Sequence, residues 1–152
     1  MQSPTIRISI RRQRLTLHRG RGRKKLEYPV SSSRYGLGTT PESYQTPLGR
    51  FEIGEKIGAG APLGAVFKSR KPTGEIGAAS NPADLVQTRI LWLHGLDPEN
   101  ANTRERYIYI HGTNHEEELG TTASHGCIRM RNADVAELYD LVLKGTPVTI
   151  QP

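Results

Sequence analysis

The residues best suited to chemistry are Cys127, the only cysteine of the chain, and two histidines, His111 and His125. A thiol beside an imidazole has the parts needed for covalent acyl transfer, because the histidine can take the thiol proton while the sulfur attacks. Cys127 follows Gly126, and backbone N–H groups at such a turn can face a developing oxyanion. This arrangement predicts a nucleophilic cysteine.

Two other interpretations of the cysteine follow from residue types alone. A single cysteine is most often a small, buried apolar residue. Cys127 could also join a metal site, since possible ligands stand near it in the sequence, namely His111, His115, Glu116–Glu118 and His125. Their spacings match no standard zinc pattern, and three consecutive glutamates are typical of a solvated loop. We therefore expect no metal and no cofactor.

Of the two histidines, His111 is the better candidate for the base. It directly follows the apolar segment 106–110, which places it at the end of a predicted strand. His125 stands two positions before Cys127, and side chains with that spacing do not meet on a regular helix or strand. We expect 128–130 to form a short helical turn, whose N-terminus would favour the thiolate.

The elements that must position these residues are mostly strands. Alternating or continuous apolar residues predict strands over 5–10, 14–18, 26–30, 51–57, 89–96, 106–110 and 147–150. One helix is predicted over 132–145, with Asn132 as its cap and Gly145 just after its end. Residues 58–88 are rich in Gly, Ala, Pro and Ser, and only 65–70 could form a short strand. We expect this segment to be a long loop or mobile lid over the cysteine.

The composition fits one domain spanning 1–152, with 16 glycines and 10 prolines that favour a β-rich fold. The net charge of +6 arises in 11–25, which holds eight of the 21 Lys and Arg residues and no acid. This tract overlaps a strand pattern and has no interleaved aromatic residues. It indicates a solvated hairpin face, or a loose surface for an anionic polymer, rather than nucleic-acid binding.

No segment has the apolar length of a membrane span, and the first ten residues lack the apolar core of a signal peptide. We therefore expect no membrane contact. We also expect a cytoplasmic protein, or a periplasmic one if a leader is missing from the sequence.

Taken together, HGT at 111–113 and SHGCIRM at 124–130 resemble the signature of the L,D-transpeptidase catalytic domain family, the YkuD fold. TPLGRF at 46–51 is similar to the family's TPxGxF segment, and 134–150 is similar to its closing helix and strand. The resemblance implies a mostly β, sandwich-like catalytic domain with one main C-terminal helix and a long loop or lid. It also implies that Cys127 is the nucleophile.

Further roles follow from the resemblance. His111 would be the base, oriented by the backbone carbonyl of Gly112, and N–H groups near Gly126 and Cys127 would form the oxyanion hole. The residues that would shape the site and position substrate are Ser124 and His125. Many members have asparagine where this chain has Arg129. Its guanidinium could bind a substrate carboxylate through paired hydrogen bonds, or it could brace the local backbone.

The implied substrate is a peptidoglycan stem tetrapeptide, cut between the L-centre of its third residue and D-alanine through a Cys127 thioester. Water as acceptor gives L,D-carboxypeptidase activity, as in muropeptide recycling, and we expect it to be favoured because no leader or wall-binding module is evident. The alternative is a periplasmic transpeptidase that forms 3→3 cross-links. Carbapenem-type β-lactams would be covalent inhibitors. A metal-dependent hydrolase and a non-catalytic wall-binding module are alternatives of other classes.

Overall fold

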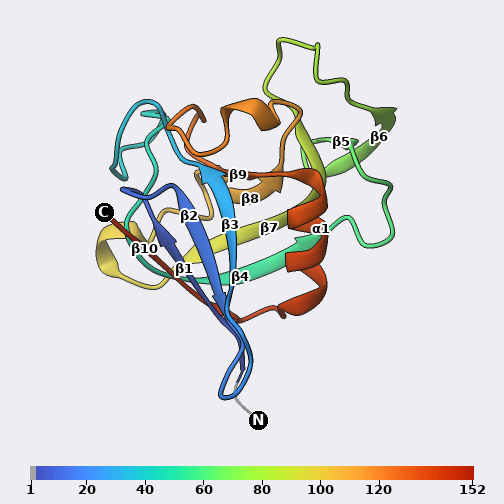
Figure 1. Cartoon of the computed structure of the whole chain (residues 1–152). Coiled ribbons are helices and arrows are strands. Elements are labelled where there is room, and N and C mark those ends of the chain that lie inside the picture. Colours follow the sequence, from blue (N-terminus) through green and yellow to red (C-terminus); the bar gives the residue numbers. More distant parts are fainter. Residues whose placement is uncertain (1–2) are drawn as a thin grey trace.

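One continuous sheet dominates the computed structural model, which describes residues 3–152 (Figure 1). Its strands are β1 (Thr5–Ser9), β2 (Arg14–His18), β3 (Leu26–Ser31), β4 (Gly49–Ile57), β5 (Ala65–Lys68), β6 (Lys71–Ile76), β7 (Val86–Gly95), β8 (Tyr109–Gly112), β9 (Ile128–Met130) and β10 (Pro147–Gln151). The helices are α1 (Asn132–Leu141) and the short 3-10 turns η1 (Pro98–Asn100) and η2 (Glu116–Glu118). The predicted mostly β fold with one main helix is confirmed. None of the helices in residues 3–152 has the length and apolar content needed to cross a membrane.

The sheet closes on itself. Its order runs β4-β10-β1-β2-β3-β9-β8-β7, and β4 also pairs with β7, which joins the two ends. The β5–β6 hairpin extends from β7 and leaves the closed sheet at the right of Figure 1. Two neighbouring pairs are parallel, β1 with β10 and β8 with β9.

The core lies inside the closed sheet because strand residues alternate between its two faces. In the β1–β2 pair, Ile6 lies opposite Leu17 and Ile8 opposite Leu15, and all four are buried. The helix α1 packs on β7 and β8 and adds buried apolar side chains such as Leu138 to the same cluster. Truncating a fully buried leucine to alanine typically costs about 2–5 kcal/mol, so this face holds α1 in place.

The segment 128–130 was predicted as a helical turn, and this prediction is wrong. The residues form β9, with Ile128 opposite Ile110 of β8 and Met130 opposite Val30 of β3. A segment of three residues, two of them apolar, is too short to show a periodicity of its own, so the backbone groups of the two flanking strands decide its conformation.

The helix also differs in detail from the prediction. It ends at Leu141 rather than at 145, and Asn132 is its first residue rather than its cap. The Asn132 side chain instead donates to Gln87 Oε1 and Thr113 O and accepts from the Thr88 hydroxyl. Asn132 therefore joins the start of α1 to β7 and to the end of β8.

The segment 58–88 contains more regular structure than a loop. It holds β5 and β6, which leaves the connections 58–64 and 77–85 (Figure 1). The expected short strand over 65–70 is present as β5, while β6 carries Pro and Gly, which masked its strand pattern.

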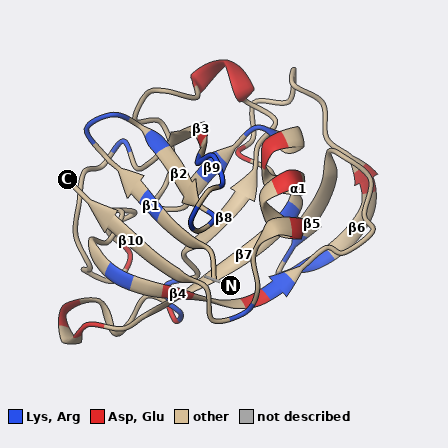
Figure 2. Cartoon of the chain, turned by 60° about the horizontal axis from the view of Figure 1, so that its bottom comes forward, with Lys and Arg blue, Asp and Glu red and all other residues tan. Residues whose placement is uncertain are grey.

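The basic tract 11–25 divides into two groups at opposite ends of β2 (Figure 2). Arg11 and Arg12 lie in the β1–β2 turn, whereas the residues of 19–25 form the β2–β3 loop. The positive charge of this tract is therefore not one continuous face.

Candidate active site

The register of β8 and β9 brings a histidine and the cysteine to one face of the sheet. Ile110 lies opposite Ile128, and both are in the core. Side chains alternate along a strand, so His111 and Arg129, which are also paired, lie on the other face. Cys127, two positions before Arg129, shares this face and packs against the aromatic cluster outside the closed sheet.

The Cys127 thiol lies between two backbone groups of the segment that leads into β8. The Tyr109 N–H donates to Sγ at 3.3 Å, and the thiol donates to Tyr107 O at 3.4 Å. Burial of the sulfur raises the pKa of Cys127 to about 11, which outweighs the lowering effect of the Tyr109 N–H. This direction favours a neutral thiol. The residues after Cys127 form a strand, so the helix N-terminus that was expected to favour the thiolate is not present there.

The His111 imidazole is buried, and its Nδ1 lies 2.6 Å from the carbonyl oxygen of Gly112. A carbonyl oxygen only accepts, so Nδ1 carries the hydrogen and Nε2 is the nitrogen that can accept a proton. Burial lowers the pKa of His111, although the Asp84 carboxylate opposes this effect. The imidazole is therefore neutral at neutral pH, as a general base must be.

The turn before the cysteine is fixed from two sides. The Ser124 hydroxyl donates to Cys127 O at 2.6 Å and accepts from the Gly126 N–H at 3.2 Å. Gly126 has φ +119°, a conformation that favours glycine. The Thr46 hydroxyl, from the TPLGRF segment, donates to Gly126 O at 2.9 Å. Ser124, Gly126 and Thr46 thus set the backbone that carries the thiol.

His125 lies at the rim of the site. Its ring packs against Tyr35 and Tyr44, with centroids 5.8 and 5.9 Å away. Its Nδ1 lies 3.1 Å from Asp84 Oδ2, and 40% of the side chain is exposed. Two tyrosine rings and the Asp84 carboxylate thus hold the His125 ring in place. Its exposed part is open to contact with a substrate.

Asp84, which no sequence pattern singled out, lies in the connection 77–85. Its Oδ1 is 3.0 Å from Arg129 Nη2, and its other oxygen meets His125. Burial alone would raise the pKa of Asp84. The electrostatic effects of His111, in its protonated form, and of Arg129, with the bonds from Arg129 and His125, outweigh burial and lower the pKa. The available signal was that Asp84 is the only acid in 77–88.

The Arg129 guanidinium is only 1% exposed and lies between two carboxylates. Besides Asp84, its Nη1 meets Glu118 Oε1 of η2 at 2.9 Å. Its Nε has no hydrogen-bond partner in the part of the chain that the structure describes. Of the two roles considered for Arg129, these contacts favour bracing of the site, and they give Glu118 a structural partner rather than a solvated position.

The connection 77–85 is attached to the end of β8 through one buried amide. The Asn114 Nδ2 group donates to the carbonyl oxygens of Asn81 and Ala83 at 2.9 and 3.1 Å, and Oδ1 accepts from the Leu85 N–H at 3.1 Å. Asn114 therefore holds the backbone on both sides of Asp84.

The ligands considered for a metal site do not converge. Within residues 3–152, no group of three or more His, Cys, Asp or Glu side chains is arranged to hold an ion. The His115 ring instead forms a hydrogen bond with the backbone of the connection 77–85. The distance from its Nε2 atom to Asn81 O is 2.7 Å.

Two hollows of about 370 Å³ each are lined in part by residues of 105–109, the segment whose backbone bonds the thiol. The first, which we call the Arg70 hollow, is lined by Phe67, Ser69, Arg70, Val86, Ile90, Tyr107 and Tyr109. The second, the Tyr44 hollow, is lined by Pro41, Glu42, Tyr44, Glu105, Arg106, Tyr107, Ile108 and His125. Both hollows share Tyr107, whose backbone carbonyl oxygen accepts a hydrogen bond from the Cys127 thiol.

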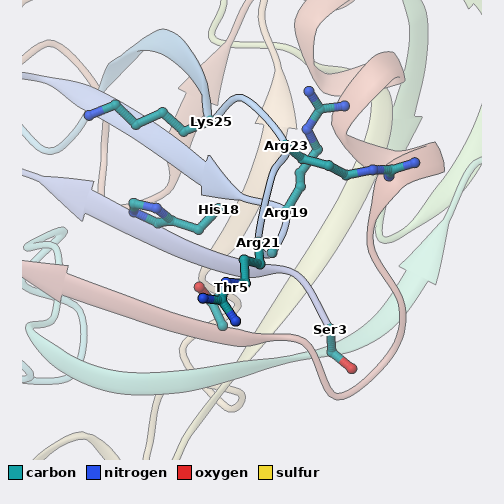
Figure 3. Close-up of a pocket in the computed structure, with 8 residues that line it drawn as sticks. Ser3, Thr5, His18, Arg19, Arg21, Arg23 and Lys25 are labelled. Atoms are coloured by element: carbon teal, nitrogen blue, oxygen red, sulfur yellow. The ribbon is translucent and has the colours of Figure 1, made fainter. Parts of the chain in front are cut away.

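A larger hollow of about 790 Å³ lies elsewhere, at the β2–β3 loop (Figure 3). It is lined by Ser3, Thr5, His18, Arg19, Gly20, Arg21, Arg23 and Lys25. Its cationic groups do not converge, since the Lys25 amine points away from the guanidinium groups of Arg19 and Arg23 (Figure 3). The loop precedes β3, whereas β9 pairs with the far end of that strand, so this hollow is separate from the candidate site.

The model of the L,D-transpeptidase catalytic domain (YkuD) matches residues 3–150, and the chain belongs to this family. The putative L,D-transpeptidase YkuD of Bacillus subtilis is 34% identical over 106 residues, which cover 70% of this chain and 45% of the relative. The putative L,D-transpeptidase YqjB of the same organism is 36% identical over 117 residues, which cover 76% and 57%. The chain thus spans about half the length of these relatives.

Solved structures agree on the fold. The crystal structure of L,D-transpeptidase 3 from Mycobacterium tuberculosis, in complex with a faropenem-derived adduct, matches with a TM-score of 0.61 at 20% identity. The match covers 99% of this chain and 60% of that chain. The predicted family and fold are therefore confirmed.

Proposed function

We propose that this protein is a cysteine acyl-transfer enzyme that acts on peptidoglycan stem tetrapeptides and cleaves the bond between the third residue and D-alanine. The observation that carries the proposal is that His111 lies in β8 and Cys127 directly precedes β9, the strand paired with β8, with His111 Nδ1 bound to Gly112 O. The substrate class is supported by membership of the L,D-transpeptidase family.

The raised pKa of Cys127 and the lowered pKa of His111 favour a neutral pair. In the first half-reaction, His111 Nε2 takes the thiol proton while Sγ attacks the carbonyl carbon of the third residue. The tetrahedral intermediate then expels the D-alanine nitrogen, which receives that proton from the imidazolium. The products are a Cys127 thioester and free D-alanine.

Backbone N–H groups at the Gly126–Cys127 turn are the proposed oxyanion donors. In this structure the Gly126 N–H donates to the Ser124 hydroxyl, which leaves the Cys127 N–H as the main proposed donor. Asp84 and Arg129 act behind this turn as positioning residues, since they hold the rim histidine and the strand after the nucleophile.

In the second half-reaction, His111 deprotonates the acceptor, which attacks the thioester and restores the thiol. Water yields a tripeptide, and the amine of a second stem yields a 3→3 cross-link. We propose water as the favoured acceptor. The support is that water needs no binding site of its own, whereas the amine of a second stem must be held in place beside the thioester.

Mass spectrometry of the purified protein with a disaccharide-tetrapeptide tests the proposal. We expect tripeptide, free D-alanine and a transient adduct on Cys127, with no turnover in a folded Cys127→Ala variant. Turnover in that variant would exclude the thioester and favour another class of hydrolase, and binding without any turnover would favour a wall-binding module. The same reaction with excess D-amino acid or second stem tests the acceptor, since predominant exchange or dimer would overturn the preference for water.

The proposed compartment for recycling of wall fragments is the cytoplasm, with the periplasm as the alternative for cross-linking. Fractionation of cells that express the full-length natural protein, followed by immunoblotting, distinguishes the two.

A further inference from the structure

Arg70 is a cation that lies among aromatic side chains and lines one of the two hollows that share Tyr107. Its guanidinium carbon lies 5.1 Å from the ring centroid of Trp92 and 5.0 Å from that of Tyr107. Its Nη1 donates to the Tyr109 hydroxyl at 3.2 Å. Three aromatic side chains therefore fix the orientation of the guanidinium group, which lowers the entropy lost when it binds a ligand.

The charge of Arg70 has no acidic partner. Within residues 3–152, no carboxylate forms an ion pair with it, and only aromatic groups contact its side chain. Arg104 provides the contrast. It stacks on the same Trp92 ring, at 4.5 Å, but its Nη2 is paired with Glu55 Oε2 at 2.7 Å.

The Arg70 hollow and the thiol share two neighbouring residues. Tyr107 and Tyr109 line the hollow, and they are also the residues whose backbone groups bond Cys127 Sγ. In our proposal, a peptide whose carbonyl carbon lies at the sulfur places a neighbouring group in this hollow.

The backbone at Arg70 adopts a conformation that is unfavourable for arginine. Lys68 pairs with Lys71, so Ser69 and Arg70 form a two-residue hairpin loop, with φ +48° and +66°. Glycine and asparagine adopt such angles more easily in this kind of loop. An arginine at this position does not stabilise the turn. We therefore infer that it is present because its side chain has a function.

We propose that the Arg70 hollow binds a carboxylate of the stem peptide and so selects substrates that carry a negative charge next to the scissile bond. This inference rests on the proposed function. A guanidinium fork matches a carboxylate through paired, charge-assisted hydrogen bonds, and one edge of Arg70 is already oriented by Tyr109. Two groups of the substrate have this chemistry, the C-terminal carboxylate of D-alanine and a side-chain carboxylate of the third residue.

The alternative role of Arg70 is to cover the aromatic cluster without touching substrate. That role would affect all substrates equally, whereas carboxylate binding affects only those that carry the charge. The test therefore compares three tetrapeptides: one with both carboxylates free, one amidated at the C-terminus, and one amidated on the third side chain.

Each peptide is assayed with wild type, Arg70→Gln, Arg70→Lys and the control Arg104→Gln. Loss of a charge-assisted hydrogen bond predicts a fall in kcat/KM of about tenfold to a hundredfold for Arg70→Gln on the free peptide. Arg70→Lys should recover part of that loss, and Arg104→Gln should behave as wild type. Thermal unfolding of each variant establishes that it is folded.

The amidated peptide on which wild type and Arg70→Gln become equal identifies the carboxylate that binds. Equal loss on all three peptides, or no loss on any, would overturn the inference. Calorimetric binding of the same peptides in a Cys127→Ala background supplies a readout without turnover. If wild type cleaves none of the peptides, the proposed function fails, while a charge-dependent difference in binding at Arg70 would still support the carboxylate site.

Discussion

Asp84 and Arg129 form an ion pair at 3.0 Å, although one lies in the connection 77–85 and the other in β9. Arg129 is buried and stands two positions after Cys127, so this contact ties the loop to the strand that follows the proposed nucleophile. The same carboxylate holds His125 through its second oxygen. A residue outside the family motif thus supports two residues within it.

Replacing Asp84 with asparagine should destabilise the protein by about 1–3 kcal/mol, because a buried guanidinium loses a charged partner. The free energy of unfolding in urea measures this. Glu117→Gln is the control, since Glu117 is an exposed neighbour of Glu118 in η2. Equal stability of Asp84→Asn and wild type would show that the ion pair contributes nothing.

The contribution of Asp84 should depend on pH. Its pKa is lowered in the folded protein from the ordinary value of 3.8, so the unfolded state binds the proton more readily. The stabilisation is therefore present above the ordinary value and is lost as the pH falls through the lower folded value. The difference in Tm between wild type and Asp84→Asn should be full at pH 7 and should shrink in strong acid. A difference that stays constant would contradict this.

The two histidines should differ in their effect on acylation. His111→Ala should slow formation of a β-lactam adduct on Cys127 by about 10²–10⁴-fold, the usual effect of a positioned general base. His125→Ala should act mainly on KM, because that ring lies at the rim with Tyr35 and Tyr44. Adduct formation is followed by mass spectrometry, with His18→Ala in β2 as the control. A larger loss in His125→Ala than in His111→Ala would reverse the assignment.

Alkylation should report a neutral thiol. The pKa of Cys127 is raised to about 11, so the rate with iodoacetamide should be slow at pH 7 and should increase steadily into the alkaline range. Cys127 is the only cysteine, so the mass of the alkylated protein reports on this residue alone. A rate that reaches a plateau near neutral pH would instead indicate a thiolate–imidazolium pair.

Thr46→Val should reduce activity more than stability. The Thr46 hydroxyl donates to Gly126 O and accepts from the Ser33 N–H, so its loss loosens the turn that carries the thiol. We expect kcat/KM to fall about tenfold, which corresponds to about 1.4 kcal/mol. Thr146→Val, at another buried threonine whose hydroxyl accepts from Leu143 N–H, should lower Tm without a comparable loss of activity.

The connection 77–85 was expected to belong to a mobile lid, and Asn114 is the residue that should control its motion. Asn114→Ala removes the bonds to Asn81, Ala83 and Leu85. We expect faster hydrogen exchange in 77–85 of the variant, with no change in β1 or β2. Unchanged exchange in 77–85 would show that other contacts hold the loop.

The strands with a clear alternation were predictable from the sequence. β1, β2, β4 and β10 each bury every second residue along much of their length, and the sequence shows that pattern directly. β8 begins later than predicted, at Tyr109, because Tyr107 has φ +56° and ends a turn. No apolar pattern encodes that angle.

The site was predictable where residues stand close together in the chain. Cys127 and His111 lie in two short motifs, whereas Asp84 and Arg70 lie in segments whose composition suggests loop. Their importance depends on the pairing of β5 with β7 and of β7 with β8, which joins segments far apart in the sequence. A single sequence carries no local signal for such contacts.

The closed sheet leaves β6 as a strand that, within residues 3–152, pairs on one side only. Every residue of β6 is exposed, and the strand carries Pro72, Gly74 and the charged Lys71 and Glu75. A proline cannot donate to an incoming strand, and charges at an edge oppose the approach of a second copy. The hairpin that presents Arg70 can therefore project into solvent without templating fibril-like self-association, and Pro72→Val with Glu75→Val should make the protein aggregate more readily at high concentration.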